Sequence, residues 1–234
     1  MNYLAWGDGS FKIPIAMNLL ISIAVIVIGS SFASFAQKTP LALFEIGISA
    51  NAYRGDLGKP YSKYDMSIHA GLRMNKYKRI NFHARITYGH LTAQSTTFQS
   101  KDLTKTPASY VRTTLAALQA GLYANIFKTS RYNLFIAQEI GLLRFEPKDE
   151  QGRKLADLPN TRAQDESYNT IALIFPTVVG AVYYFSNGFG IGTQVGWYNT
   201  LTPYLDNINK LGGEKGNDNI YAWKFFFYVP LKIR

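Results

Sequence analysis

The stretch DMSIHAGLRMNKYKRINFHARITYGHLTAQ, from Asp65 to Gln94, alternates apolar and polar side chains in two successive runs. Successive side chains of a β-strand point to opposite faces, so this alternation predicts two strands, each with one apolar face. Residues 75–79 form the short turn of a predicted hairpin. The apolar members are Met66, Ile68, Ala70, Leu72 and Met74 in the first run and Ile80, Phe82, Ala84, Ile86 and Tyr88 in the second.

Similar alternating segments recur along the chain and bring the predicted total to about eight strands, the number found in the smallest membrane barrels. After residue 40 no apolar stretch is long enough for a further membrane helix. The last segment has one wholly apolar face that we expect to meet lipid, formed by Tyr221, Trp223, Phe225, Phe227, Val229, Leu231 and Ile233. The other predicted segments lie near 41–52, 109–127, 133–145, 169–185 and 188–201.

The connections between these segments alternate in length. Short links lie near 75–79, 128–132 and 186–187, and longer polar links lie near 53–64, 95–108, 146–168 and 202–218. Outer-membrane barrels have short periplasmic turns and long extracellular loops. The sequence therefore predicts an all-β fold, a single closed antiparallel transmembrane β-barrel with both termini in the periplasm. A secreted β-sandwich or lipocalin-like barrel is the alternative, but its outward faces would be polar.

The composition agrees with a barrel in a membrane. Aromatic residues make up 15% and charged residues only 17% of the 234 residues, whereas the mean hydropathy of -0.08 is that of a soluble protein. Lipid-facing and lumen-facing residues that alternate give this combination. The net charge of +10 is not accompanied by a nucleic-acid-binding motif, so we interpret the basic residues as binding anionic lipid head groups. The chain has no Cys, which excludes disulfides and thiolate sites.

Residues 1–36 have the order of a signal peptide, and residues 37–234 form the predicted barrel domain. The apolar run Ile13–Gly29 leads into small residues, and Ser34 and Ala36 precede the expected cleavage site. The mature protein is then expected to begin at Gln37 and to be exported to the outer membrane. Two points stay open: translation can start at Met1 or Met17, and an uncleaved membrane anchor is the alternative interpretation.

Several polar side chains share the face that the alternation directs into the lumen. An eight-stranded barrel has room for side chains but not for an aqueous channel, so a porin is disfavoured. Buried charges are costly unless they are paired, and we therefore predict a structural charge network without a bound metal or cofactor. Its predicted members are Glu45, His69, Arg73, His83, Arg85, Gln119, Glu139, Gln194 and Lys224.

A lipid-modifying enzyme is the alternative for the same residues. His69 and His83 are expected to lie diagonally across the hairpin, and Glu139 could orient one of them as in a Ser-His-Glu hydrolase. However, the sequence offers no G-x-S-x-G motif, no nucleophile at a convincing spacing and no closely spaced metal ligands. We therefore expect neither catalysis nor a small-molecule substrate.

The predicted short turns and the C-terminus carry basic residues and no Asp or Glu within 75–79, 128–132 or 186–187. This rim is either a docking surface for a periplasmic protein or a binding surface for lipid phosphates, and the sequence leaves both open. The basic rim consists of Lys76, Lys78, Arg79, Lys128, Arg131, Lys232 and Arg234.

Three stretches resemble an outer-membrane barrel family of Bacteroidota that includes the PorG-like component of the type IX secretion system. The first, Phe44–Gly47 with Ala52–Leu57, is similar to a Glu-x-Gly strand that ends in Tyr-x-Gly-Asp-Leu. The second is Gly141–Pro147, and the third is Gly196–Asn209, where Thr200–Asn207 is similar to the family's motif except that Pro203 replaces its acidic residue. The resemblance implies a role in protein transport, in which the barrel ties periplasmic secretion-apparatus subunits to the outer membrane. Arg234 stands where such barrels usually end in an aromatic residue.

Overall fold

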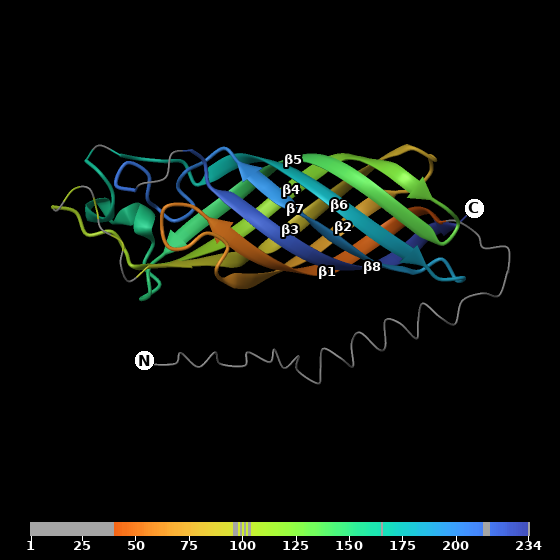
Figure 1. The fold of residues 1–234 in the computed structure, drawn as a ribbon, viewed down its shortest axis with the longest axis horizontal. Helices are drawn as coiled ribbons and strands as arrows, with labels where there is room; N and C mark the ends of the chain where they lie inside the picture. Colours follow the sequence, from red (N-terminus) through yellow and green to blue (C-terminus); the bar gives the residue numbers. More distant parts are fainter. Residues whose placement is uncertain are drawn as a thin grey trace, which may run out of the picture. The chain divides into compact units, whose positions relative to one another are not determined.

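The computed structural model describes residues 40–233 except 96, 97, 99, 101, 103, 165 and 213–215, with the side chains of 232 and 233 left out. The signal-peptide prediction and the start at Gln37 lie outside the described residues. Within them, eight antiparallel strands close into a barrel in chain order, as predicted (Figure 1). The strands are β1 (Pro40–Arg54), β2 (Tyr64–Met74), β3 (Ile80–Gln94), β4 (Tyr110–Lys128), β5 (Tyr132–Lys148), β6 (Ile171–Tyr184), β7 (Gly190–Thr200) and β8 (Asn219–Ile233).

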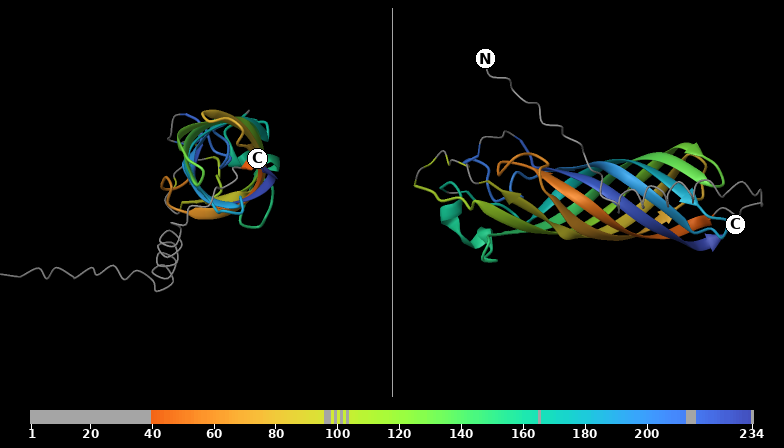
Figure 2. Two further views of the ribbon diagram at one scale, coloured as in Figure 1. Left: turned by 90° about the vertical axis from the view of Figure 1, so that its right-hand side faces the viewer. Right: turned by 60° about the horizontal axis from the view of Figure 1, so that its bottom comes forward.

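Pairing between β1 and β8 closes the wall, and the view along the barrel shows a continuous ring of strands (Figure 2). Closure gives the first and last strands the partner that an open sheet would lack. In a membrane this is essential, because the hydrocarbon region offers no water to satisfy an exposed strand edge.

The predicted alternation of the hairpin is confirmed. Ile68, Leu72 and Met74 of β2 are exposed, whereas His69 and Arg73 between them are buried in the barrel. The last strand follows the same rule, with Trp223, Phe225, Phe227 and Leu231 exposed on the outside and Phe226 and Tyr228 buried inside. The exposed faces of all eight strands together form the apolar surface that meets lipid.

The connections also follow the predicted alternation in length. The short turns span 75–79, 129–131 and 185–189, and they lie at the end of the barrel where β1 begins and β8 ends. The long loops lie at the other end, and the loop after β5 contains two short 3₁₀ helices, Leu155–Asp157 and Pro159–Thr161, that the sequence did not indicate. No helix among the described residues is long and apolar enough to cross a membrane.

The ladder between β5 and β6 is interrupted near its middle. The ladder pairs Gln138 with Thr177 and resumes at Gly141 with Ile174, and Pro176 in the gap has no N–H to donate. The Gln138 side chain compensates, because its Nε2 donates to the carbonyl oxygens of Pro176 (3.2 Å) and Glu139 (3.1 Å). Thr177 Oγ1 donates to Gln138 Oε1 at 2.7 Å, so the outward amide is satisfied. Gln138 is therefore part of the wall and not a neutral lipid-facing residue.

The placement of the strands in the membrane predicts that a charged side chain on the lipid-facing surface is more destabilising at mid-membrane than near the barrel ends. Ile86 is outward and near the middle of β3, so Ile86→Lys should reduce the free energy of unfolding by about 2–4 kcal/mol. The outward Tyr64 lies at the loop end of β2, and Tyr64→Lys should cost about 0–1 kcal/mol. Urea unfolding in lipid vesicles measures both values, and equal costs would contradict the proposed membrane placement.

Candidate functional site

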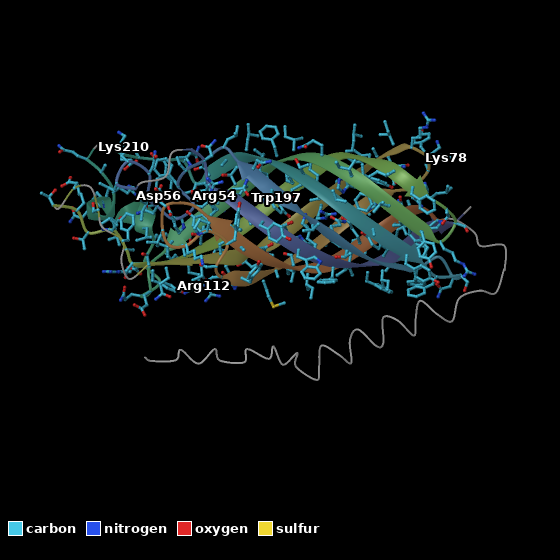
Figure 3. The ribbon with its side chains drawn as sticks, in the orientation of Figure 1. Arg54, Asp56, Lys78, Arg112, Trp197 and Lys210 are labelled. Carbon is cyan, nitrogen blue, oxygen red and sulfur yellow. The ribbon has the colours of Figure 1, made fainter. Side chains whose placement is uncertain are left out.

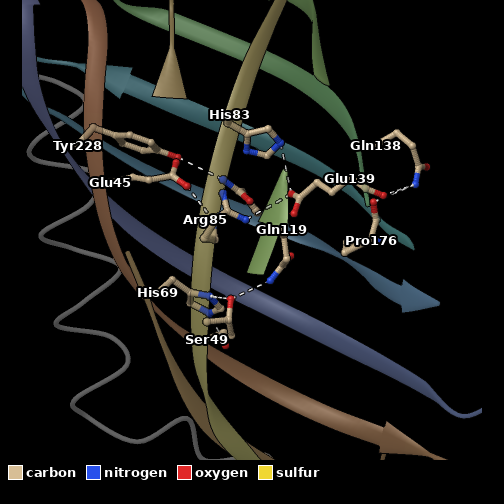
Figure 4. Close-up of polar contacts among 12 residues, drawn as sticks. Glu45, Ser49, His69, His83, Arg85, Gln119, Gln138, Glu139, Pro176 and Tyr228 are labelled. Carbon is tan, nitrogen blue, oxygen red and sulfur yellow. Dashed lines mark hydrogen bonds and ion pairs between the residues drawn. The ribbon is translucent and has the colours of Figure 1, made fainter. Parts of the chain in front are cut away.

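The centre of the lumen holds an ion-paired cluster around Arg85 of β3 (Figure 4). Arg85 Nε donates to Glu45 Oε1 at 2.7 Å, and Arg85 Nη1 lies 3.4 Å from Glu139 Oε1. These three side chains come from β1, β3 and β5 and are at most 2% exposed. His83 Nε2 lies 3.5 Å from the same oxygen of Glu139. The lumen thus brings together four residues of the predicted network.

His69 belongs to a separate chain of neutral hydrogen bonds. Its Nε2 lies 2.8 Å from Ser49 Oγ, and its Nδ1 lies 2.9 Å from Thr87 Oγ1, which accepts from Gln119 Nε2. Ser49 donates its own proton to Asn51 Oδ1 at 2.9 Å. The Ser49 oxygen therefore accepts from His69, which is the opposite of a serine activated by a histidine base.

The expected diagonal placement of the two histidines is wrong. The β2–β3 register pairs His69 with Thr87 and Arg73 with His83, which separates the histidines by four positions along the ladder. As a result, the serine contacts one histidine and Glu139 contacts the other. A hydrolase triad is not assembled among these residues. The described residues also hold no group of three or more His, Asp or Glu able to bind a metal ion.

Two of the predicted lumen cations lie against aromatic rings instead of carboxylates. The guanidinium carbon of Arg73 is 3.8 Å from the ring centroid of Tyr123 and 4.0 Å from that of Phe135. Lys224 Nζ is 4.6 Å from the ring centroid of Tyr198. Neither cation has a hydrogen-bond or ion-pair partner among the described residues. The prediction that every inward charge pairs with an opposite charge is wrong here, because ring faces supply part of the stabilisation.

The aromatic rings around Arg73 come from four different strands and form a layer at the turn end of the lumen. A buried apolar cluster there includes Tyr123 of β4, Phe135 of β5, Tyr184 of β6 and Tyr228 of β8. Phe135 fits because Gly180 faces it: a Cβ at this position would lie 2.5 Å from the ring. The sequence alone could not place these rings together, because only the barrel register aligns them.

At the other end of the lumen, a loop folds into the barrel mouth. We call residues 201–212, after β7, the loop cap. Its Leu205, Ile208 and Leu211 are buried in one cluster with Leu57 and inward side chains of the wall. The amide of Leu57 donates to Asp206 Oδ2 at 2.8 Å. The loop end of the lumen is thus filled by apolar side chains of the chain itself.

The loop cap joins two of the stretches that carry the family resemblance, Ala52–Leu57 and Thr200–Asn207. Besides the bond between Leu57 and Asp206, Tyr53 Oη donates to Asp218 Oδ1 at 3.2 Å. Asp218 also accepts from the amide of Leu205 at 2.7 Å. These short motifs therefore meet in space and fix the cap, a role that their separation in sequence did not reveal.

The loop after β5 holds the cap from the other side. Asn207 has a positive φ of 67°, and its Oδ1 accepts from Arg162 Nη1 at 3.1 Å and from Tyr168 Oη at 2.8 Å. The Tyr168 ring stacks on Tyr204 with a centroid distance of 4.6 Å. Arg162 is itself buried and donates to the carbonyl oxygen of Leu155. Two long loops therefore interlock over the lumen.

The loop cap and the residue before β8 contribute two buried carboxyl groups, Asp206 and Asp218. Burial raises the pKa of Asp206 to about 6, and the nearby Asp56 adds to the rise. Burial and the charge of Asp206 raise the pKa of Asp218 above its usual range. Both shifts favour the protonated form in the closed arrangement, so ionisation of either group weakens the cap.

The turn end of the barrel exposes part of the predicted basic rim. Lys76, Lys78 and Arg79 are exposed on the 75–79 turn, and Lys78 lies at the opposite end of the barrel from Lys210 (Figure 3). Lys128 differs, because its Nζ donates to the carbonyl oxygens of Asn75 (3.2 Å) and Tyr77 (2.8 Å) and ties two turns together. Arg131 is half-buried. The side chains of Lys232 and Arg234 lie outside the described residues.

Comparisons with known proteins show the fold and not a family. No protein-family model and no curated protein sequence matches the chain. Neisserial surface protein A matches with a TM-score of 0.51 at 10% identity, over 81% of this chain and 97% of that protein. The attachment invasion locus protein of Yersinia pestis matches with a TM-score of 0.47 at 10% identity over the same shares. The outer membrane enzyme PagL has a TM-score of 0.37 at 14% identity, over 80% of this chain and 99% of its own. The chain has the fold of a small outer-membrane β-barrel.

The ion-paired cluster predicts an order of destabilisation. Glu45→Ala removes the shorter of the two pairs to Arg85 and should reduce the free energy of unfolding by about 3–5 kcal/mol, because a buried cation loses its partner. Glu139→Ala should cost less, since Arg85 keeps the 2.7 Å pair with Glu45. Urea unfolding in vesicles measures both, with the adjacent outward Ile46→Ala as control. If Glu45→Ala and Glu139→Ala reduce the free energy of unfolding no more than the control does, water must screen the charge of Arg85.

The raised pKa of Asp206 predicts a cap that loosens as the pH rises. A folded-state pKa of about 6, above the ordinary value, gives stability that is complete at low pH and lost as the pH increases through about 6. Hydrogen exchange in the loop cap, corrected for the intrinsic pH dependence of exchange, should increase between about pH 4 and 6, from the ordinary pKa of an aspartate to the raised pKa. Asp206→Asn should reduce this increase, and Asp206→Asn with Asp218→Asn should remove it. Protection that stays constant with pH in the unmodified protein would contradict the prediction.

Proposed function

We propose that this protein is a non-enzymatic outer-membrane barrel that anchors a periplasmic protein through its basic turns, in the manner of the PorG-like secretion components that its sequence resembles. The observation that carries the proposal is the 75–79 turn. It exposes Lys76, Lys78 and Arg79 next to one another and contains no acidic residue. Such a surface fits an acidic patch on a partner, which charge complementarity would guide and orient.

The filled lumen supports an anchoring role over transport through the barrel. Apolar side chains of the loop cap occupy one end, the Arg85 cluster occupies the centre and the aromatic layer around Arg73 occupies the other. The buried Ser49 and His69 are hydrogen-bonded to each other in the wrong sense for a nucleophile and its base. The surface, and not the interior, is then where this barrel meets other molecules.

The basic turn is also held rigidly, which favours a specific interface. Lys128 binds two carbonyl oxygens of the 75–79 segment, and Asn81 exchanges hydrogen bonds with the backbone of Tyr77 in both directions. A turn fixed in this way loses little conformational entropy when a partner binds. Attraction to lipid phosphates, the competing role, needs no such preorganisation.

Charge reversal on the turn tests the proposal. Lys78→Glu with Arg79→Glu should abolish co-purification of a periplasmic protein from outer membranes, because interface energy concentrates in a few residues. The control is Lys59→Glu with Lys210→Glu, an equal charge change on exposed residues of the long loops. Heat-dependent migration on a detergent gel verifies that each variant folds.

The alternatives give different outcomes in this experiment. Binding to lipid head groups predicts a gradual loss of about 1 kcal/mol for each basic residue and no captured protein. Recovery of the same periplasmic proteins by the turn variant, or of none by the unmodified chain, would overturn the anchoring role. A structural barrel without a partner would then be the better account.

A further inference from the structure

A second basic surface lies on the outer wall near the long loops. We call it the basic ledge, and it consists of Arg112 in β4, Arg144 and Lys148 in β5 and Lys154 in the following loop. Arg112 lies near the loop end of the barrel (Figure 3). Arg112 and Arg144 are exposed and occupy outward positions of their strands, as does Glu146, which is the one carboxylate among the ledge's described ion pairs.

The positive charges of the ledge are only partly neutralised. Glu146 binds both Lys148 (2.8 Å) and Lys154 (2.9 Å), so one carboxylate serves two ammonium groups. The β4–β5 register places Arg112 directly opposite Lys148, an arrangement of like charges that destabilises a sheet unless an anion joins it. Arg112 Nη2 lies 2.7 Å from His90 Nε2, which must accept because a guanidinium can only donate.

Arg144 is the least satisfied member of the ledge. Within the described part of the chain, its guanidinium takes part in no ion pair or hydrogen bond. Its cross-strand neighbours are Ala116 and Ile171, and Leu142 lies two positions along β5 on the same face. Ile171 and Leu142 are about half exposed, so an uncompensated guanidinium lies at the edge of the lipid-facing apolar surface. A ligand for Arg144 must therefore combine an anionic group with hydrocarbon chains.

The spacing of the ledge limits the head group. Arg144 and Lys148 are four residues apart on one strand, about 13 Å at the rise of an extended chain. Glu146 lies between them on the same outward face, so a single phosphate that bridged Arg144 and Lys148 would lie against this carboxylate. A head group with two separated phosphates can instead place one near Arg144 and the other between Arg112 and Lys148. Guanidinium groups bind phosphate in bidentate fashion, which suits both arginines.

We propose that the basic ledge binds a bisphosphorylated glycolipid of the outer leaflet, with Arg144 on one phosphate and Arg112 and Lys148 on the other. The long loops of such barrels are extracellular, so the ledge lies at the level of outer-leaflet head groups. Acyl chains of the lipid pack on the exposed side chains of Leu142 and Ile171. The site is distinct from the basic turn, which lies at the opposite end of the barrel.

Native mass spectrometry of the protein in an uncharged detergent tests this site with bisphosphoryl lipid A as the probe. The unmodified protein should retain one lipid A and bind it at least 10-fold more tightly than monophosphoryl lipid A or phosphatidylglycerol. Arg112→Gln with Arg144→Gln should weaken binding about 30-fold, the effect of losing two surface charges. Lys59→Gln with Lys210→Gln, which removes the same charge from the loops, should leave the affinity unchanged.

Each of the other outcomes overturns the proposal. Equal binding of phosphatidylglycerol would show a general attraction for lipid phosphate, and an equal loss in the loop variant would show an effect of net charge. Failure of the unmodified protein to retain lipid A would remove the site altogether. The comparison among lipids uses the unmodified protein, so it decides the question even if a variant does not fold.

Discussion

The structure depends on the pairing of every backbone N–H and C=O group in the membrane-spanning wall. Hydrocarbon offers these groups no alternative partner, so the sheet must close, and β1 must meet β8. Closure then assigns each side chain to lipid or lumen by its position in the alternation. The gap at Pro176 illustrates how strict the requirement is, because a lipid-facing glutamine supplies the missing donor at the middle of the wall.

Closure with eight strands also leaves an interior that side chains fill completely. The lumen accommodates its buried cations in two ways. Arg85 shares two carboxylates, whereas Arg73 and Lys224 lie against tyrosine and phenylalanine rings. The apolar layers above and below keep the central charges away from bulk water, so the pairs act in a medium of low polarity.

The loops make the interior inaccessible from the outside. The loop cap is bound through Asp206 and Asp218 to the end of β1 and through Asn207 to the loop after β5. We therefore propose that the barrel acts through two surfaces, a basic turn at one end and a basic ledge on the wall near the other. The two differ in what surrounds the charge: the turn is flanked by water, and the ledge borders the apolar surface.

The sequence by itself determined the barrel, the number of strands, the inward and outward face of each segment and the alternation of turns and loops. These features are local, because period-two alternation and turn length can be read from neighbouring residues. Only the tertiary structure decided which inward residues meet. Register and closure align residues from distant strands. As a result, Glu139 contacts His83 and not His69, and rings from β4, β5 and β8 surround Arg73. Closure also places Leu57 beside Asp206. Contacts of this kind depend on the relative shift of whole strands, a quantity that no short stretch of sequence contains.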